Sequence, residues 1–186
     1  MNRQKEHTLI LSPIGDHDTA LLEQITRAHN SVFGFPVHLM PLLEDLDFAF
    51  EWQRRQYHST LILEVLEQKA PTNALKILAV TREDLFIPIL THVYGEAQLG
   101  GRTSIISTYR LKEGMGSGRR DREYQARVIK EAIHEMGHTF NLRHCKDPGC
   151  IMHYCHSVAD VDRKSDTLCR YCTILLDDER KRLTSG

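Results

Sequence analysis

Three histidines close together near the C-terminal end constrain this chain more than any other feature of its sequence. They lie in the stretch from His134 to Cys145, which reads HEMGHTFNLRHC. At helical spacing His134 and His138 project from the same side of a helix, one turn apart, so both imidazoles can reach one metal ion. His144 lies too far along a straight helix to join them. The chain must therefore turn sharply after Leu142 to bring in a third nitrogen.

Three histidines, a water and a carboxylate together make a catalytic zinc site. Coordination lowers the pKa of the water to about 7, so hydroxide is available at neutral pH. Glu135 follows the first histidine and is placed to act as general base toward that water. The ordinary alternative is a solvated helix glutamate, like Glu131 one turn earlier. An HExxH motif alone is a weak signal, and the third histidine makes it a strong one.

Length and charge exclude several classes of protein. A chain of 186 residues predicts one domain that is large enough to bury a core without disulfides. Its 24 basic and 25 acidic residues nearly cancel, which argues against nucleic acid or an anionic membrane as partner. No apolar run approaches the roughly 20 residues that span a bilayer, and the N-terminus shows no signal-peptide pattern. We therefore expect a soluble, cytoplasmic protein with neither of these partners.

The cysteines favour metal binding over disulfides. All five fall between Cys145 and Cys172, whereas the framework of a secreted protein usually spreads an even number along the chain. Cys169 and Cys172 lie one helical turn apart, so their sulfurs can converge on one ion. Four thiolates make a closed structural zinc site, which would attach the segment after His144 to the terminal helix.

The N-terminal part of the chain predicts strands and helices in alternation. A strand at His7–Leu11, a helix capped by Asp16 or Asp18 and an extended run at Pro36–Leu43 form a β-α-β pattern, which favours parallel strands. A helix at Ser59–Lys69 and a buried strand at Leu75–Thr81 follow, and the segment between Asp45 and Tyr57 is ambiguous. Two further extended runs, joined by a bend at Gly100-Gly101, are Thr91–Leu99 and Thr103–Leu111.

The longest helical pattern, from Arg119 to Leu142, carries the histidines. Its expected core-facing stripe is Val128, Ile129, Ala132, Ile133, Met136 and Phe140. Regular pattern is lost between Arg143 and Asp162, and a terminal helix spans Asp166 to Leu183. These elements predict an α/β fold of the α+β type, with a mixed twisted sheet of about five strands backed by helices. We expect one catalytic domain made of an N-terminal subdomain, residues 1–143, and a zinc-clamped C-terminal subdomain, residues 144–186.

The motif resembles a known family. The pattern HExxHxxNxxH, from His134 to His144, is similar to the extended zinc motif of the metzincin metallopeptidases, with Asn141 in place of the turn glycine. Asparagine is the residue that best tolerates the left-handed conformation after glycine, so Asn141 can solve the same backbone problem. The continuation resembles the archaemetzincins, a small metzincin branch; its residues are Cys145, Cys150, Met152, Cys169 and Cys172. These motifs cover roughly the last third of the chain.

The resemblance implies a metzincin-like fold and two zinc ions per chain. The implied ligands of the catalytic zinc are His134, His138 and His144. Those of the structural zinc are Cys145, Cys150, Cys169 and Cys172. Spacing favours Cys150 over the remaining cysteine, Cys155, without excluding it, and His153 and His156 are further substitutes.

The resemblance also implies roles for Met152 and Tyr154, which follow the third histidine, and each of them has an alternative explanation. Met152 corresponds to the Met-turn residue, an apolar floor beneath the zinc, although ordinary core packing explains a methionine equally well. Tyr154 stands two residues later. It either approaches the zinc or the oxyanion of the reaction, as in some metzincins, or it is a plain packing tyrosine.

The implied function is that of a zinc-dependent metallopeptidase acting on peptides or unfolded proteins, by zinc-activated water with Glu135 as base. Metzincins lay an extended peptide antiparallel to an exposed edge strand, and Tyr94–Gly101 is the candidate edge here. Glu96 and Gln98 either contact the peptide or face solvent. The alternative function is a zinc-stabilised peptide- or protein-binding module with little or no turnover, and hydrolysis of a non-peptide amide is a third possibility. The intact Glu135 favours an enzyme.

Overall fold

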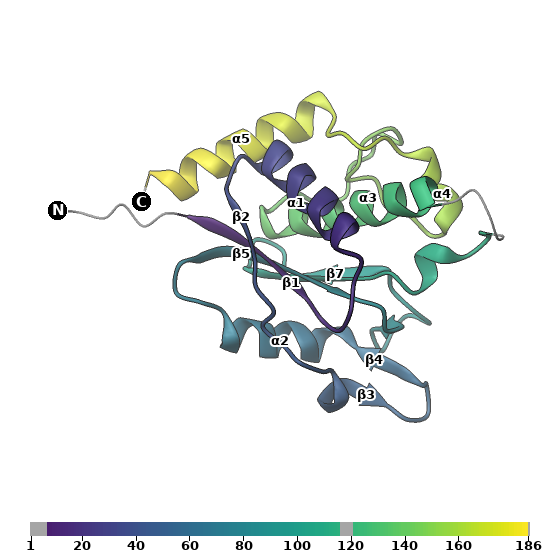
Figure 1. Ribbon diagram of the computed structural model, residues 1–186. Coiled ribbons are helices and arrows are strands. Elements are labelled where there is room, and N and C mark those ends of the chain that lie inside the picture. The colour runs from purple at the N-terminus through teal and green to yellow at the C-terminus, as the bar shows by residue number, and fades with distance from the viewer. Residues whose placement is uncertain (1–6, 116–120, 186) are drawn as a thin grey trace.

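The chain begins with the predicted β-α-β unit. The computed structural model describes residues 7–115 and 121–185 (Figure 1). Strand β1 (Thr8–Pro13), helix α1 (Thr19–Phe33) and strand β2 (Val37–Leu39) follow one another, and the two strands are parallel. The carboxylate of Asp18 caps α1 by accepting a hydrogen bond from the backbone N–H of Ala20. Gly34 ends the helix with a φ of 72°, a left-handed conformation that costs glycine little.

The main sheet has five strands in the order β2-β1-β5-β8-β7, which confirms the predicted mixed sheet. Strand β5 (Ala74–Thr81) lies at its centre and is parallel to β1 and β8 (Thr103–Ser107). Strand β7 (Gly95–Ala97) pairs antiparallel with β8 and forms one edge. The predicted run Thr91–Leu99 is thus strand only over Gly95–Ala97.

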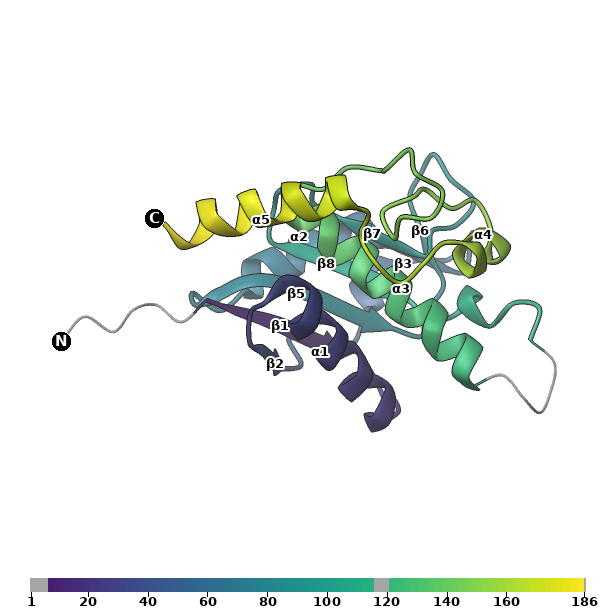
Figure 2. The ribbon, with the colours of Figure 1, turned by 90° about the horizontal axis from the view of Figure 1, so that it is seen from above.

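Helices cover both faces of this sheet (Figures 1 and 2). Helices α1, α3 (Asp121–Thr139) and α5 (Arg170–Thr184) lie on one face, and α2 (Ser59–Lys69) lies on the other. On the first face Phe33 stacks on Phe140, with ring centroids 4.8 Å apart. Five of the six residues of the predicted α3 stripe are fully buried, and Ile129 is half-buried. This packing holds α3 rigidly against the sheet.

The ambiguous segment forms part of a second, small sheet. Its strands are β3 (Phe50–Glu51), β4 (Gln56–His58) and β6 (Leu85–Phe86), in the order β3-β4-β6, after a single 3-10 turn at Asp47–Ala49. The Arg54 guanidinium donates to the carbonyls of Leu90 and Thr91, and the amide of Gln56 also donates to the carbonyl of Thr91. The small sheet therefore fixes the segment that leads into β7.

The C-terminal part contains one helix that was not predicted. Helix α4 (Val158–Arg163) lies within the supposedly irregular stretch and begins with a capping box of Ser157 and Asp160. A 3-10 turn at Arg110–Lys112 likewise replaces the end of the predicted run Thr103–Leu111. Helix α5 starts at Arg170 instead of Asp166, because Cys169 serves as its N-cap. The predicted start of α3 at Arg119 lies outside the described residues.

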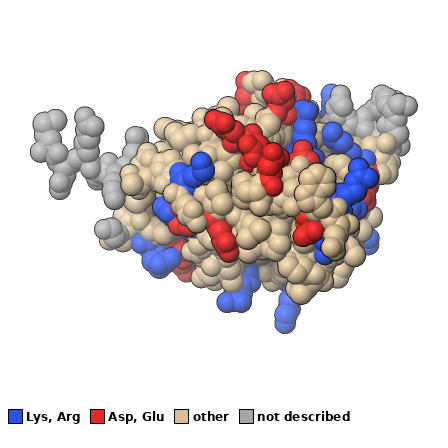
Figure 3. Space-filling model, turned by 90° about the horizontal axis from the view of Figure 1, so that it is seen from below, with Lys and Arg blue, Asp and Glu red and all other residues tan. Residues whose placement is uncertain are grey.

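The charged side chains show no dominant sign. Acidic and basic groups both occur on the face of the molecule that Figure 3 shows, in keeping with a net charge of −1. Within residues 7–115 and 121–185, no helix is long and apolar enough to cross a membrane.

A buried histidine joins α1 to α3. His29 is 2% exposed, and its two ring nitrogens lie 2.9 Å from the carbonyl of Ile25 and 3.2 Å from that of Ala132. Burial lowers the pKa of His29 to about 4, although both carbonyls favour the protonated ring. The neutral ring carries one N–H and can donate to only one of them.

This depressed pKa predicts a loss of stability in mild acid. The unfolded chain takes up the His29 proton near pH 6.5 and the folded chain only near pH 4, so the contribution of His29 is complete above 6.5 and lost between these values. The change amounts to about 3 kcal/mol. Urea unfolding of the wild type and of His29→Gln, which keeps an N–H donor but does not titrate, measures it. Equal pH dependence in the two proteins would contradict the prediction.

Candidate active site and second metal centre

The three candidate histidine ligands converge on one point. One ring nitrogen from each histidine lies within 4.8 Å of the other two, and the Nε2 atoms of His134 and His138 are 3.2 Å apart. The Nδ1 atom of His134 lies 2.9 Å from the carbonyl of Ile151, and that of His138 lies 2.7 Å from the carbonyl of Leu142. Both Nδ1 atoms must therefore carry the proton, which leaves two Nε2 lone pairs facing each other with no hydrogen between them.

This arrangement fits a zinc ion. With zinc–nitrogen distances of about 2.0–2.1 Å, a tetrahedral site places its nitrogens about 3.3 Å apart, close to the observed spacing. Backbone carbonyls that hold the Nδ1–H groups fix the tautomer and the orientation of each ring, as is usual for histidines that bind metal. Burial keeps these rings neutral, since it lowers the pKa of His134 well below its usual value and that of His138 to about 4.

The sharp turn after α3 has the predicted geometry. Asn141 has a φ of 61°, in the left-handed region, as expected for the residue that replaces the turn glycine. The N–H of Asn141 donates to the carbonyl of His138, and the N–H of Leu142 donates to that of Gly137. These bonds end the helix and reverse the chain, so that the ring centroid of His144 lies 4.8 Å from that of His138.

A buried lysine from the central strand supports the same turn. The ammonium of Lys76 donates to the carbonyls of Thr139 and Gly101, at 2.6 and 2.7 Å, and its pKa is lowered by burial to about 8. A cation at a helix C-terminus also interacts favourably with the helix dipole. In addition, the N–H of Gly100 donates to the carbonyl of His138. The β7–β8 turn and the end of α3 are thereby joined.

Met152, the predicted Met-turn residue, packs against α3 at Gly137, between His134 and His138. It is fully buried, and a Cβ atom placed on Gly137 would lie only 2.6 Å from its sulfur. Gly137 sits between the two histidines of α3, where glycine costs helix stability. Its lack of a side chain allows the methionine to pack directly against the helix backbone at this point.

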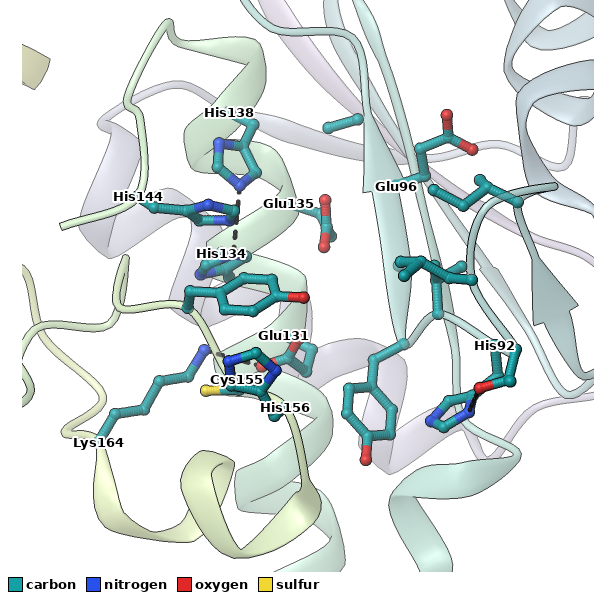
Figure 4. A pocket seen from close by; sticks show the side chains of 18 residues that line it. His92, Glu96, Glu131, His134, Glu135, His138, His144, Cys155, His156 and Lys164 are labelled. Carbon is teal, nitrogen blue, oxygen red and sulfur yellow. Dashed lines mark hydrogen bonds and ion pairs between the residues drawn. The ribbon is translucent and has the colours of Figure 1, made fainter.

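Glu135 lies in the pocket between the histidines and β7 (Figure 4). This pocket has a volume of about 430 Å³, and Glu135 is 6% exposed. Burial raises the pKa of its carboxyl well above the usual value, and the nearby Glu131 raises it further. Strand β7 approaches so closely that a Cβ atom on Gly95 would lie 2.5 Å from Cγ of Glu135. The carboxylate is thus confined by the glycine of the edge strand.

A buried ion pair at one end of the pocket was not predicted. Glu131, expected to be solvated, is 4% exposed, and its carboxylate accepts a hydrogen bond of 2.8 Å from the ammonium of Lys164. Lys164 follows α4 and also lines the pocket (Figure 4). The ammonium compensates a negative charge one helical turn from Glu135. The sequence signal for this ion pair was the position of Glu131, three residues before His134 on the same helix.

The second candidate centre consists of four cysteines. The sulfurs of Cys145, Cys150, Cys169 and Cys172 lie within 4.8 Å of one another. Those of Cys145 and Cys169 are 3.7 Å apart, and zinc–sulfur bonds of about 2.3 Å in a tetrahedron predict about 3.8 Å. The N–H of Cys172 donates to the sulfur of Cys169 and holds the pKa of that thiol below its usual value. Cys155 lies apart from this group and lines the pocket beside Lys164.

Other predicted residues have mixed outcomes. Tyr154 lines the pocket, with its ring centroid 4.9 Å from that of His144. The Nδ1 atom of His153 lies 2.9 Å from the carbonyl of Cys145, and His156 packs against the Tyr154 ring. Glu96 is half-buried and lines the pocket, and its carboxylate accepts hydrogen bonds from the hydroxyls of Ser59 and Thr60 on α2.

Comparison with known proteins agrees with this geometry. Residues 17–178 match the model of peptidase family M54. The chain belongs to this family, the archaemetzincins. It is 34% identical over 171 residues to the archaemetzincin of Methanocaldococcus jannaschii, with 91% of this chain and 93% of that protein covered. Members of the family are zinc metallopeptidases, so the chain is a hydrolase.

Two solved archaemetzincin structures have the same fold. The crystal structure from Methanopyrus kandleri matches with a TM-score of 0.81 at 32% identity, covering 97% of this chain and 99% of that one. The structure from Archaeoglobus fulgidus, solved as a complex with malonate, matches with a TM-score of 0.76 at 32% identity, covering 90% and 99%. The metzincin-like fold predicted from the motif is therefore confirmed.

The close contact between Gly95 and Glu135 predicts the effect of one added methyl group. The added Cβ atom of Gly95→Ala would also lie 2.7 Å from the backbone carbonyl oxygen of Ile105, so both the carboxylate and the strand must shift. We expect kcat to fall by about tenfold to a hundredfold, since groups at a reacting centre tolerate little misplacement. Zinc content should stay unchanged because no histidine is touched. Gly149→Ala, outside the pocket, is the matched control, because its added Cβ atom would meet only the Asp147 carboxylate, at 3.4 Å. Full activity of Gly95→Ala would show that Glu135 does not depend on this contact.

Proposed function

We propose that this archaemetzincin hydrolyses peptide bonds in the pocket between α3 and β7. His134, His138 and His144 would hold a zinc ion, and Glu135 would act as general base. The observation that carries the proposal is the pair of facing Nε2 atoms, 3.2 Å apart, next to a buried carboxylate and beneath a free sheet edge. A bound zinc ion supplies the positive charge that polarises the peptide carbonyl and activates water.

The free edge of β7 offers a template for an extended peptide. The N–H of Ser107 donates to the carbonyl of Tyr94, and the N–H of Gln98 donates to that of Thr103. In an antiparallel pair these bonds alternate, so the backbone groups of Gly95 and Ala97 point away from β8. A peptide that pairs with them lies in the pocket, over Glu135. This is strand addition, which uses backbone bonds for affinity and leaves side chains for specificity.

Glu135 has the environment of a general base. Its raised pKa brings proton affinity closer to neutral pH, where a carboxylate accepts a proton from attacking water more effectively. The same carboxyl can then give the proton to the leaving amine. Tyr154, whose ring packs beside that of His144, carries a hydroxyl that can donate to the substrate oxygen as negative charge develops there. The ion pair of Glu131 and Lys164 lines the same pocket.

Removing the base tests the proposal. Glu135→Ala should lower kcat on a mixed peptide library by about a hundredfold or more, because general-base catalysis contributes on that scale. Zinc content should match that of the wild type. Glu123→Ala, an exposed position on the same helix, is the control. If neither wild type nor variant cleaves any peptide while both retain peptides, the chain uses this pocket for binding and the proposal fails.

The four-cysteine group leads us to propose a structural zinc as well. Elemental analysis should find one zinc ion for each of the two ligand groups in every chain. Cys150→Ser should remove the structural ion and lower thermal stability, because structural zinc contributes directly to folding. Cys155→Ser should keep both ions. Full zinc content in Cys150→Ser, or loss of an ion in Cys155→Ser, would refute this ligand set.

A further inference from the structure

A second groove begins beside the candidate active-site pocket. It has a volume of about 760 Å³ and lies over the cysteine cluster. We call it the cysteine groove; the residues that define it are Asn141, Arg143, Lys146, Arg170, Tyr171 and Leu175. His144 lines both this groove and the active-site pocket. The two hollows therefore meet at the third candidate ligand.

The walls of the cysteine groove combine positive charge with apolar surface. Within the described residues, the side chains of Arg143, Lys146 and Arg170 form no ion pair or hydrogen bond. Asp147 is the acidic residue among the lining side chains, and its carboxylate accepts a hydrogen bond from the N–H of Gly149. The ring of Tyr171 is 67% exposed on the first turn of α5, and Leu175 lies one turn later.

The direction in which β7 runs decides which part of a peptide substrate would reach this groove. The C-terminal end of β7 leads into the turn whose Gly100 N–H donates to the carbonyl of His138. A Cβ atom placed on Gly100 would lie 3.5 Å from the Asn141 side chain, which itself lines the groove. A peptide antiparallel to β7 has its amino-terminal side at this end of the strand. Its upstream residues therefore point toward the cysteine groove.

We propose that the cysteine groove binds the part of a peptide substrate on the amino-terminal side of the cleaved bond, and that it favours acidic side chains next to apolar ones. Carboxylates fit the three unpaired cations, and aliphatic side chains fit the surfaces of Tyr171 and Leu175. The inference rests on the proposed function, since it continues the peptide path along β7. It extends that function by naming a second binding surface and the chemistry of the substrate.

The positive charge of Arg143, Lys146 and Arg170 beside the cysteines has one competing explanation. Four thiolates around one zinc ion carry an excess of negative charge, which nearby lysine and arginine side chains can offset. In that case, reversing the charge of Lys146 would weaken metal retention at the cysteines and leave substrate preference unchanged. A groove that binds peptide predicts the opposite pattern. Zinc content and peptide preference therefore separate the two.

Three peptides with one cleavable core test the proposal. The first is the core alone, the second carries Asp-Leu-Glu-Leu on its amino side, and the third carries the same residues on its carboxyl side. The zinc-loaded wild type should cleave the second with a kcat/KM about tenfold above the first, through a lower KM, as expected for a few exposed ionic and apolar contacts. The third should gain no advantage that depends on the groove.

Variants then test whether the higher kcat/KM of the second peptide comes from the cysteine groove. Lys146→Glu and Tyr171→Ala should each remove most of the ratio between the second and first peptides, with zinc content unchanged. Lys181→Glu is the matched charge reversal, on an exposed residue of α5 outside the groove, and should keep the ratio. If all variants keep the same kcat/KM ratio between the second and first peptides and still cleave the core, the groove does not bind the peptide. The peptidase proposal then remains intact. Loss of zinc from Lys146→Glu with an unchanged ratio overturns it in favour of the counter-charge explanation.

A binding measurement decides the question without turnover. Fluorescence anisotropy with the labelled second peptide and zinc-loaded Glu135→Ala should give a Kd about fivefold to tenfold lower than with the core alone. Adding Lys146→Glu to this variant should remove the difference. Equal affinity for the two peptides overturns the groove even if the wild type cleaves neither of them.

Discussion

The end of helix α3 is the constraint on which the rest of the site depends. Two candidate ligands lie on the helix and the third lies beyond it, so one turn decides whether three nitrogens can meet. The carbonyl of His138 accepts hydrogen bonds from the N–H groups of Asn141 and Gly100, and Lys76 holds the next carbonyl at 2.6 Å. These donors come from the turn itself, from the β7–β8 hairpin and from the central strand. Sheet, hairpin and active-site helix are thus joined at a single point.

The two candidate metal centres are coupled through the backbone that follows this turn. Cys145 comes directly after His144, and its N–H donates to the carbonyl of Met152. Met152 packs against Gly137 between the two helical histidines, while the carbonyl of the preceding Ile151 faces Nδ1 of His134. A metal ion on the cysteines would therefore stabilise the segment that orients two of the three histidines. The proposed structural and catalytic metal sites therefore share one short piece of chain.

Local signals in the sequence predicted two kinds of feature. One is the helices whose ends are marked by characteristic residues, and the other is the groups of histidines and cysteines whose spacing suits one metal ion. Helix α2 has the predicted bounds, Ser59 to Lys69, because Pro71 and Asn73 follow its end within four residues. The left-handed Asn141 was predicted for the same kind of reason, since few residues tolerate that conformation. The strands of the small sheet are two or three residues long and leave too little periodicity to detect.

Contacts between distant segments left no comparable trace in the sequence. Lys164 lies in a stretch without regular pattern, yet its ammonium reaches Glu131 on α3 and is fully buried there. The choice of Cys150 over Cys155 depends on the fold of the loop, because both follow Cys145 at distances that suit a metal site. Gly95 is the exception, since a glycine within a strand often marks close approach of another group. That reading becomes specific only when the structure places Glu135 against it.

The electrostatics of the pocket explain why a buried lysine is tolerated beside a metal site. An unpaired ammonium there would repel a zinc ion, and an unpaired Glu131 would compete with Glu135 for protons. Paired at 2.8 Å and excluded from water, the two charges largely cancel at a distance while keeping a polar wall in place. The net charge near the histidines is then set by Glu135 and by whatever the histidines bind. Among the described residues that line the pocket, Glu135, the proposed general base, is then a carboxylate beside the histidines with no ammonium or guanidinium as its partner.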